Sequence, residues 1–304
     1  MSFSVLSEKM LIFVVLMAMG YVFARTKYVS DSFVKDASKL VLNVFTPATI
    51  LYSVLDSNMS TEELFASIAA MTVMILISYA VGFAAVKLLR VKGKTAATFE
   101  LLISTMNTMF IALPVAEQLY GSKAVFFVSI SCLPTNFVLY SYGIWRFTGN
   151  GQGSKFDPKK IFSVQLVATV IAIVLFLVKP PIPGAAKELL KSLSGVTMPL
   201  SMFVVGASLA SVGVFEAFKE KTGYITSFFR LIVCPALVYL VLRLFISDPV
   251  LLKTTVITAA APSGVIVTIL SVQYDKDYVF SSKGILLCTI LSMFVYPLWA
   301  LILG

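Results

Sequence analysis

Histidine is absent from this 304-residue chain, and charged residues are scarce, at 13% of the sequence. The missing histidine removes the commonest metal ligand and the usual proton relay near neutral pH. Soluble domains have roughly 25% charged residues. The composition therefore indicates a chain whose surroundings are mostly lipid.

Cysteine is also rare, and the sequence shows neither a metal-ligand spacing nor a disulfide framework. The three cysteines fall inside apolar stretches and are expected to pack there; they are Cys132, Cys234 and Cys288. No cofactor motif is visible, and no Asp pair or Ser-Lys arrangement stands in facing apolar spans. The sequence therefore argues against an intramembrane enzyme and predicts no cofactor and no metal.

Long apolar runs dominate the chain, which is 59% hydrophobic with a mean hydropathy of +0.94. About 20 apolar residues suffice to cross a bilayer. The runs predict ten spans, near residues 5–24, 37–55, 64–90, 97–119, 124–147, 161–179, 188–213, 224–246, 250–273 and 279–303. Bulky residues follow the first run, so we expect an uncleaved helix rather than a signal peptide.

The net charge of +9 could indicate nucleic-acid binding, but the cations are spread over the connections between spans. Of the 24 Lys and Arg residues, 15 lie in connections after odd-numbered spans. Cytoplasmic loops carry an excess of Lys and Arg, so both chain ends are expected on the non-cytoplasmic side of the cell membrane. The loop after the sixth span is an exception, with Lys179, Lys187 and Lys191. Membrane lipid, and no nucleic acid, is the expected partner.

One segment has the composition of a linker: residues 148–160, TGNGQGSKFDPKK. It divides the spans into five and five. We therefore expect a first five-helix unit at 1–147, a cytoplasmic linker at 148–160 and a second unit at 161–304.

The two units resemble each other in short stretches. Pro47 matches Pro199 at a spacing of 152, and Tyr120 matches Tyr274 at a spacing of 154. A unit of five spans begins and ends on opposite sides of the membrane, so its repeat is inverted. Inverted repeats recur in secondary transporters, with a substrate site near the midplane that broken helices form.

Two spans in corresponding positions combine polar residues with proline. These residues are Asn107, Thr108 and Pro114 in the fourth span and Pro262, Ser263 and Gly264 in the ninth. Proline in a helix interior costs about 3 kcal/mol or more, and the freed backbone groups need protein or water partners. Crossing half-helix N-termini would direct partial positive charge at one centre, which suits an anion. The alternative is that the prolines only kink the spans and the hydroxyls bond back to helix carbonyls.

Three stretches, LNVFTPATILYSV, NTMFIALPVAEQLYG and APSGVIVTILSVQY, resemble the auxin efflux carrier family, which includes plant PIN carriers and bacterial malonate and malate permease-like members. The resemblance covers essentially the whole chain; the long cytoplasmic loop of many plant members is missing. It implies an all-α polytopic membrane protein with ten transmembrane helices in two inverted five-helix repeats, like sodium/proton antiporters and bile-acid symporters. It also implies a scaffold of helices 1, 2, 6 and 7 and a transport domain of helices 3–5 and 8–10. In the transport domain the proline-broken helices 4 and 9 cross. Transport by elevator-like alternating access, and often a homodimer, are implied as well.

Family members move organic anions, chiefly carboxylates. The resemblance places a substrate contact on Asn107 and the crossover prolines at Pro114 or its vicinity and at Pro262. A supporting Gln before a Cys in helix 5 corresponds here to Ser131, just before Cys132. Because of this departure, the aromatic auxin of plants need not be the substrate.

Five further polar residues in apolar spans are candidates. Arg230 could be a carboxylate counter-ion, a partner for a backbone carbonyl at a hinge, or an Arg reaching the headgroups. Glu100 and Glu117 lie on either side of the expected break; either could carry a coupling proton, but a position near the membrane interfaces is favoured. Asn136 and Asn43 are expected to line the pocket, from helix 5 and from the scaffold.

The sequence therefore predicts a secondary transporter of small carboxylates such as malonate or malate. A membrane potential, negative inside, favours exit of an anion by roughly 2.3 kcal/mol per charge per 100 mV, so uptake would need a proton or sodium ion. The open alternatives are a non-transporting anion sensor and a channel on the same fold.

Overall fold

The computed structural model describes residues 3–56, 59–148, 163–210 and 214–304, and its regular elements are helices. Within these residues, six helical runs are long and apolar enough to cross a membrane: Asp31–Asp56, Thr61–Leu88, Ser122–Thr148, Gly184–Ala210, Lys221–Leu242 and Tyr278–Leu303. Shorter apolar helices cover Leu11–Arg25, Val164–Val178 and Pro249–Ala259. The expectation of an all-α polytopic membrane protein is confirmed.

The helices of the first half are α1 (Phe3–Arg25), α2 (Asp31–Leu40), α3 (Thr46–Asp56), α4 (Thr61–Leu88), α5 (Lys94–Ser104), α6 (Leu113–Tyr120), α7 (Ser122–Ile130), α8 (Cys132–Val138) and α9 (Ile144–Thr148). Those of the second half are α10 (Val164–Val178), α11 (Gly184–Ala210), α12 (Val214–Phe218), α13 (Lys221–Phe228), α14 (Cys234–Leu242), α15 (Pro249–Ala259), α16 (Ile266–Gln273) and α17 (Tyr278–Leu303). Four wider π-helical turns continue some of them: η1 (Val41–Phe45), η2 (Thr108–Ala112), η3 (Leu139–Gly143) and η5 (Phe229–Val233).

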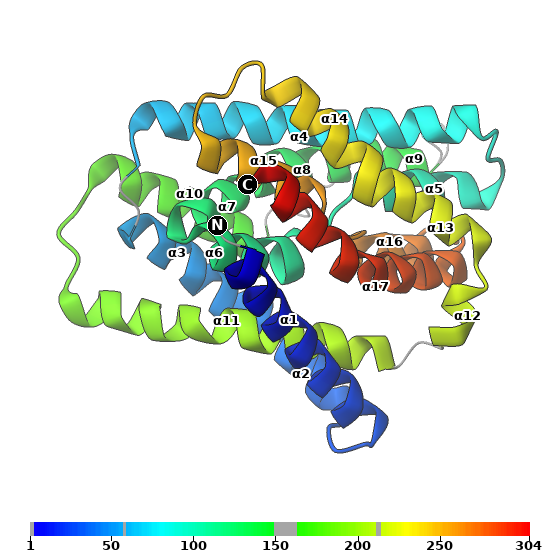
Figure 1. Ribbon diagram of the computed structural model, residues 1–304, viewed down its shortest axis with the longest axis horizontal. Helices are drawn as coiled ribbons and strands as arrows, with labels where there is room; N and C mark the ends of the chain where they lie inside the picture. Colours follow the sequence, from blue (N-terminus) through cyan, green and yellow to red (C-terminus); the bar gives the residue numbers. More distant parts are fainter. Residues whose placement is uncertain (1–2, 57–58, 149–162, 211–213) are drawn as a thin grey trace.

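The long helices α4 and α11 run along opposite edges of the molecule, with the broken helices between them (Figure 1). α1 crosses α11 closely, because glycines stand at the contact. A Cβ on Gly20 would lie 2.0 Å from the Phe203 carbonyl oxygen, and one on Gly206 would lie 1.9 Å from the Met17 carbonyl oxygen. Small residues allow such backbone approach between membrane helices. α3 packs on α11 as well, where the Thr49 and Thr197 hydroxyls lie 2.6 Å apart.

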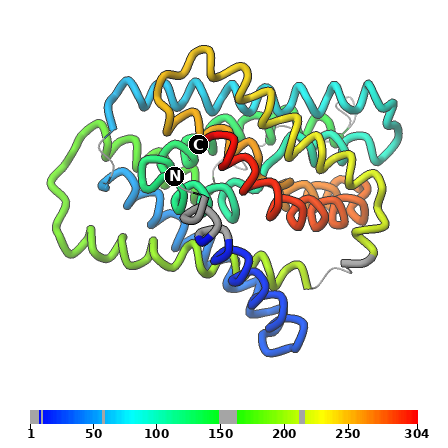
Figure 2. The backbone as a smooth tube through the Cα atoms, viewed as in Figure 1, coloured from blue at the N-terminus to red at the C-terminus, as the bar shows by residue number. Residues whose placement is uncertain are grey.

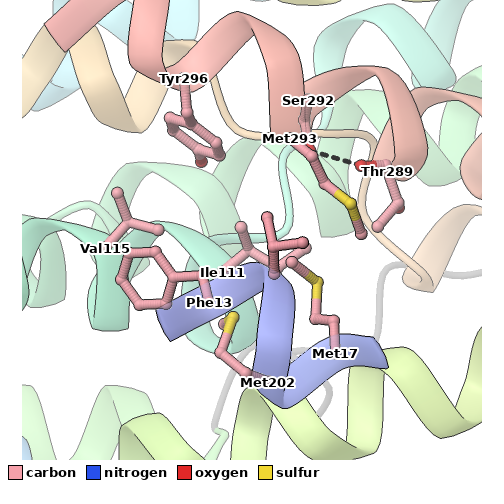
Figure 3. Close-up of a pocket in the computed structure, with 10 residues that line it drawn as sticks. Phe13, Met17, Ile111, Val115, Met202, Thr289, Ser292, Met293 and Tyr296 are labelled. Carbon is pink, nitrogen blue, oxygen red and sulfur yellow. Dashed lines mark hydrogen bonds between the residues drawn. The ribbon is translucent and has the colours of Figure 1, made fainter. Parts of the chain in front are cut away.

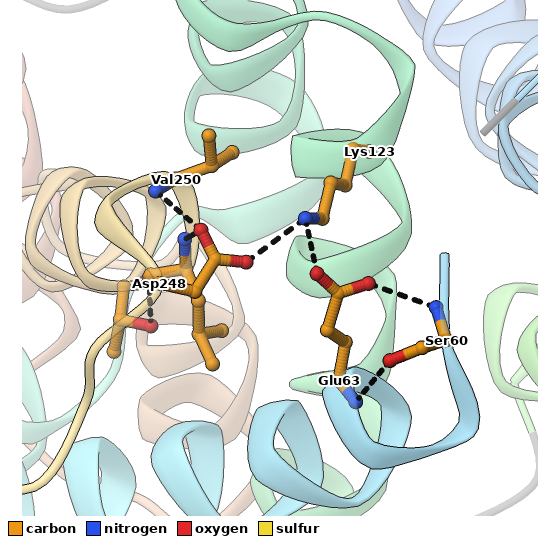
Figure 4. A network of polar contacts seen from close by, with 7 residues as sticks. Ser60, Glu63, Lys123, Asp248 and Val250 are labelled. Atoms are coloured by element: carbon orange, nitrogen blue, oxygen red, sulfur yellow. Dashed lines mark hydrogen bonds and ion pairs between the residues drawn. The ribbon is translucent and has the colours of Figure 1, made fainter. Parts of the chain in front are cut away.

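A charged network ties three helix N-termini together (Figure 4). Lys123 of α7 donates to Glu63 of α4 at 2.7 Å and to Asp248, which precedes α15, at 2.9 Å. Both acids also cap helices: Glu63 accepts from the Ser60 amide in a capping box, and Asp248 accepts from the Val250 amide. The caps satisfy N–H groups that have no partner inside the helix.

Two helices are interrupted, as expected, and the first break lies at Asn107, ahead of Pro114. The fourth predicted span leaves the helix after Ser104 and resumes at Thr108, whereas Pro114 lies seven residues past Asn107, inside the continuous run η2–α6. In the π-helical turn before Pro114, the Ala112 and Leu113 amides donate to carbonyls five residues back, those of Asn107 and Thr108, and the helix continues through Pro114. In the ninth span the prediction is correct: α15 ends at Ala259, α16 begins at Ile266, and Pro262 lies in the break.

The linker expected at 148–160 lies, except for Thr148, outside the described residues. α1 packs against α17, so the first and the last helix of the described residues are neighbours (Figure 2).

Candidate functional site

The two breaks cross and pair with each other through backbone hydrogen bonds. The Asn107 amide donates to the Pro262 carbonyl at 2.8 Å, and the Gly264 amide donates to the Thr105 carbonyl at 3.3 Å. Met106 and Ser263 face each other as an isolated antiparallel pair. The breaks thus satisfy part of each other's backbone, as lipid-embedded irregular chain requires.

Gly264 allows this close crossing. A Cβ at this position would lie 3.0 Å from the Met106 carbonyl oxygen. Ser263 adds a side-chain contact, since its hydroxyl donates to the Leu102 carbonyl at 2.6 Å. The crossing is therefore fixed by backbone and short side chains from both helices.

Arg230 holds the carbonyl ends of both interrupted helices. Its side chain comes from the π-helical turn η5 and is fully buried. Nη1 donates to the Ile103 carbonyl of α5 at 2.8 Å, and Nη2 donates to the Ala259 carbonyl, the last residue of α15. A cation at helix C-termini opposes the negative ends of the two helix dipoles. The structure thus gives Arg230 backbone carbonyls as partners.

The N-terminal ends of the resuming helices lie on the opposite side of the crossing. The Asn107 carbonyl accepts the amides of Ile111 and Ala112, at 3.3 and 3.1 Å. The amides of the residues between, Thr108 to Phe110, belong to the first turn, where helices leave N–H groups without an intrahelical partner. The Thr108 hydroxyl is buried and has no hydrogen-bond partner within the described chain. The Thr108 hydroxyl thus lies at the end of the helix where the dipole is positive.

Two cavities flank this crossing, of about 460 and about 260 Å³. Both are lined by Asn107, Phe110, Leu42, Val265 and Ile269. Among the described residues that line them, none is Asp, Glu, Lys or Arg. The electrostatic attraction for an anion therefore comes from helix ends and neutral donors.

Several predicted site residues meet at these cavities. Asn107 lines both, and Thr108 and Asn136 line the smaller one. Asn136 donates to the Ser163 hydroxyl at 3.2 Å. Pro262 and Ser263 form the crossing itself.

Three predicted residues are placed elsewhere. Pro114 is buried within α6 and is not among the lining residues of either cavity. Ser131 is fully buried, and its hydroxyl donates to the Val128 carbonyl at 2.6 Å. Asn43 is exposed, whereas its neighbour Leu42 lines both cavities. Adjacent helical residues point about 100° apart, so only one of the two faces the crossing.

The two acids of the fourth predicted span have different surroundings. Glu100 is fully buried and accepts from Arg146 Nε at 2.6 Å and from the Tyr142 hydroxyl. Glu117 is partly buried in α6 and accepts from the Ser194 hydroxyl of α11 at 3.3 Å. One acid is therefore paired with a cation, and the other has a neutral partner.

A third, much smaller cavity of about 20 Å³ lies beyond the larger one (Figure 3). Thr289 of α17 lines both. The thioethers of Met17, Met202 and Met293 gather around it, and the Tyr296 hydroxyl points into it without a partner in the described chain. Its volume admits about one water molecule. Thr289 thus borders both the large cavity and this very small one.

Sequence reasoning missed the apolar and hydroxyl lining of these cavities. Phe110, Thr135, Tyr140 and Thr289 lie in apolar runs and have no motif around them. The only available signal was proximity to Asn107 and Asn136, which Phe110, Thr135 and Tyr140 share.

The family model described as Membrane transport protein matches residues 5–300. The chain belongs to this family. The resemblance to auxin efflux carriers is thereby confirmed at the level of the family, which is a family of membrane transporters. The chain is similar to a protein from Methanothermobacter thermautotrophicus that is named an uncharacterized transporter. The two are 24% identical over 302 residues, which cover 98% of each chain. Another so named, from Methanocaldococcus jannaschii, is 24% identical over 306 residues, covering 97% of this chain and 98% of its own.

Proposed function

We propose that this family member carries small carboxylates, such as malonate or malate, across the cell membrane. The observation that supports the proposal is the Thr108 hydroxyl, buried without a hydrogen-bond partner in the described part of the chain, at the N-terminal turn of η2 next to Asn107 and the cavities. Each helix N-terminus is equivalent to roughly half a positive charge, so η2–α6 and α16 together match one carboxylate.

The proposed architecture is ten spans in two inverted repeats, 1–147 and 161–304, with both termini on the non-cytoplasmic side. Each broken helix counts as one span, so α5–α6 and α15–α16 are the fourth and ninth. Helices α1, α2–α3, α10 and α11 would form the scaffold. The remaining helices would form a transport domain that slides as an elevator, and the protein would be a homodimer.

The cavities support this division. The larger cavity lies between residues of the proposed scaffold, such as Val204 of α11, and residues of the proposed transport domain, such as Asn107 and Thr268. A substrate bound there would lie at the surface along which the two domains slide, where alternating access exposes it to each side in turn.

Two measurements on the purified protein test the proposal. The first is thermal unfolding with malonate, malate, succinate, citrate and butyrate for the wild type, Asn107→Ala and Gln273→Ala, an exposed amide outside both cavities. We expect a carboxylate to raise the unfolding temperature of the wild type and Gln273→Ala but not of Asn107→Ala. Butyrate tests whether one carboxylate is enough.

The second measurement is counterflow of radiolabelled malonate and malate in proteoliposomes. A carrier accumulates label transiently against unlabelled anion inside, whereas a channel does not. A sensor would show the thermal shift without counterflow. Equal stabilisation of the wild type and Asn107→Ala would contradict the assigned site.

A further inference from the structure

The Glu117 carboxylate lies between α6 and α11 without a cationic partner among the described residues. Its contact is the Ser194 hydroxyl at 3.3 Å, and no Lys or Arg nitrogen in this part of the chain lies within ion-pairing distance of it. Ser194 is buried on α11, and Glu117 is partly buried on α6. A carboxylate buried in this way is costly to ionise without a partner, and such acids in membrane helices are functional candidates.

The cations on neighbouring helices are engaged elsewhere. α6 packs against α7, α15, α11 and α1. Lys123 of α7 is held by Glu63 and Asp248, Lys253 of α15 donates to the Gly304 carbonyl, and Lys187 of α11 donates to the Leu55 carbonyl. The remaining charged groups on these helices whose side chains are described are exposed: Glu8 and Arg25 of α1, and Glu188 and Lys191 of α11.

The described groups around Glu117 are neutral. Ser194 donates a hydroxyl to it, Tyr120 follows on α6 itself, and Tyr52 of α3, whose hydroxyl donates to Asp56, lies within electrostatic reach. Burial without a counter-charge disfavours the ionised form of a carboxyl group, so this position favours a Glu117 that takes up a proton.

Position links Glu117 to the anion site. It stands nine residues after Thr108 in the continuous run η2–α6, about 14 Å at 1.5 Å per residue, and its partner Ser194 belongs to the proposed scaffold. We propose that Glu117 is the proton-binding group that couples carboxylate uptake to inward proton movement. This inference rests on the proposed function, because it needs α6 to slide past α11.

The proton balance is simple. A Glu117 oxygen takes a proton from the outer solution before the loaded transport domain moves inward, and releases it to the cytoplasm before the empty domain returns. Each cycle brings in one proton with the anion, so a malonate or malate dianion enters with one net negative charge instead of two. The membrane potential, worth roughly 2.3 kcal/mol per charge per 100 mV, then opposes uptake half as strongly, and an inward proton gradient adds a driving force of its own.

The test uses radiolabelled malonate in proteoliposomes, with and without an inward proton gradient, for the wild type, Glu117→Gln, Glu117→Asp and Glu62→Gln, an exposed acid at the start of α4. We expect the gradient to stimulate uptake at least fivefold in the wild type and Glu62→Gln. Glu117→Gln should keep malonate counterflow within about threefold but lose the stimulation. Glu117→Asp should keep the stimulation, and the pH at which uptake is half-maximal should change. This variant serves as the test if Glu117→Gln does not fold.

The outcomes separate the two proposals. Wild-type counterflow without gradient stimulation, or stimulation that survives in Glu117→Gln, overturns the assignment of Glu117 and leaves the carrier function standing. Loss of stimulation in both Glu117→Asp and Glu62→Gln also overturns the assignment, because both variants keep a carboxyl group at position 117. Absence of wild-type counterflow overturns both proposals.

Discussion

Arg230 Nη1 donates to the Ile103 carbonyl oxygen at 2.8 Å, across 127 positions of sequence. The same guanidinium reaches the Ala259 carbonyl of the other broken helix. One buried side chain thus joins the carbonyl ends of α5 and α15, while the amide ends of η2 and α16 border the cavities. Charge of opposite sign is placed on the two sides of the crossing, and the positive side is where an anion fits.

Arg230→Met is expected to destabilise the protein strongly. Each buried carbonyl that loses its donor costs about 1–3 kcal/mol, so the unfolding temperature in detergent should fall and carboxylate stabilisation should disappear. Arg243→Met is the control, because Arg243 is exposed and lies over the Tyr239 ring at 5.7 Å. Equal unfolding temperatures for Arg230→Met and the wild type would show that the crossing does not depend on the guanidinium.

Thr108→Val is expected to weaken anion binding without destabilising the empty protein. The Thr108 hydroxyl has no partner within the described chain, so its removal leaves no group there unpaired, while a hydrogen bond to a charged ligand contributes about 1.5–3 kcal/mol. The dissociation constant from thermal-shift titration should rise roughly ten- to hundredfold. Thr255→Val, which removes a hydroxyl bonded to the Leu251 carbonyl at 2.8 Å, should behave oppositely: lower stability and unchanged affinity. An unchanged affinity in Thr108→Val would move the anion away from η2.

Gly206→Ala is expected to separate α1 from α11. The new Cβ would lie 1.9 Å from the Met17 carbonyl oxygen, and forced overpacking typically costs 1–3 kcal/mol. Gly195→Ala on the same helix is a matched control, since a Cβ there meets nothing within 4 Å. It should leave stability unchanged or raise it by about 0.5–1 kcal/mol through helix propensity. Thermal unfolding in one detergent measures both, and a tolerated Gly206→Ala would contradict the close crossing.

The Lys123 network predicts a pH-dependent contribution to stability. Burial alone would raise the pKa of Asp248, but hydrogen bonds from Lys123 and from the Val250 and Leu251 amides hold it below the ordinary 3.8. A carboxyl whose pKa is lowered by folding stabilises the native state above its unfolded pKa, and this contribution is lost as the pH falls through the folded value.

The corresponding measurement compares the unfolding temperatures of the wild type and Asp248→Asn between pH 7 and pH 3. The wild type should be more stable at pH 7, and the difference should shrink below about pH 4. A difference that stays constant to pH 3 would mean that the ionised carboxylate is not what stabilises these helix ends. Asp275→Asn is a suitable comparison, because Asp275 is exposed and pairs with the exposed Lys94, and such surface pairs contribute little.

The apolar runs predicted to within a few residues where the described helices lie, and six of the helical runs are long and apolar enough to cross a membrane. Apolar run length decides which segments favour a bilayer, and polar residues such as Ser60, Ser163 and Asp277 cap helix starts, as their residue types favour. The interruption of the ninth span at Pro262 was predictable too. The interruption of the fourth span lies beside Asn107, as its polar residues indicated, but only the structure shows that the chain leaves the helix at Thr105 and that Pro114 stands inside the resumed helix.

The candidate site was predictable only where a polar residue stood out against an apolar run. Asn107, Thr108 and Asn136 stand out in this way, and all three line a cavity. Asn43 stands out equally, yet it is exposed. A lone sequence pattern does not fix which face of a helix turns toward the partner helix when both faces are apolar.

The sequence by itself determined the membrane character, the helical class, the positions of the apolar spans and the existence of polar, proline-containing segments. These follow from composition and from local backbone chemistry, which act over a few residues. Only the tertiary structure decided that Arg230 serves two carbonyl ends, that Glu100 is paired with Arg146, and that Glu117 faces Ser194 without a cation from the described chain. Those partners lie 29 to 127 positions apart, and their meeting depends on how whole helices pack rather than on any neighbouring residue.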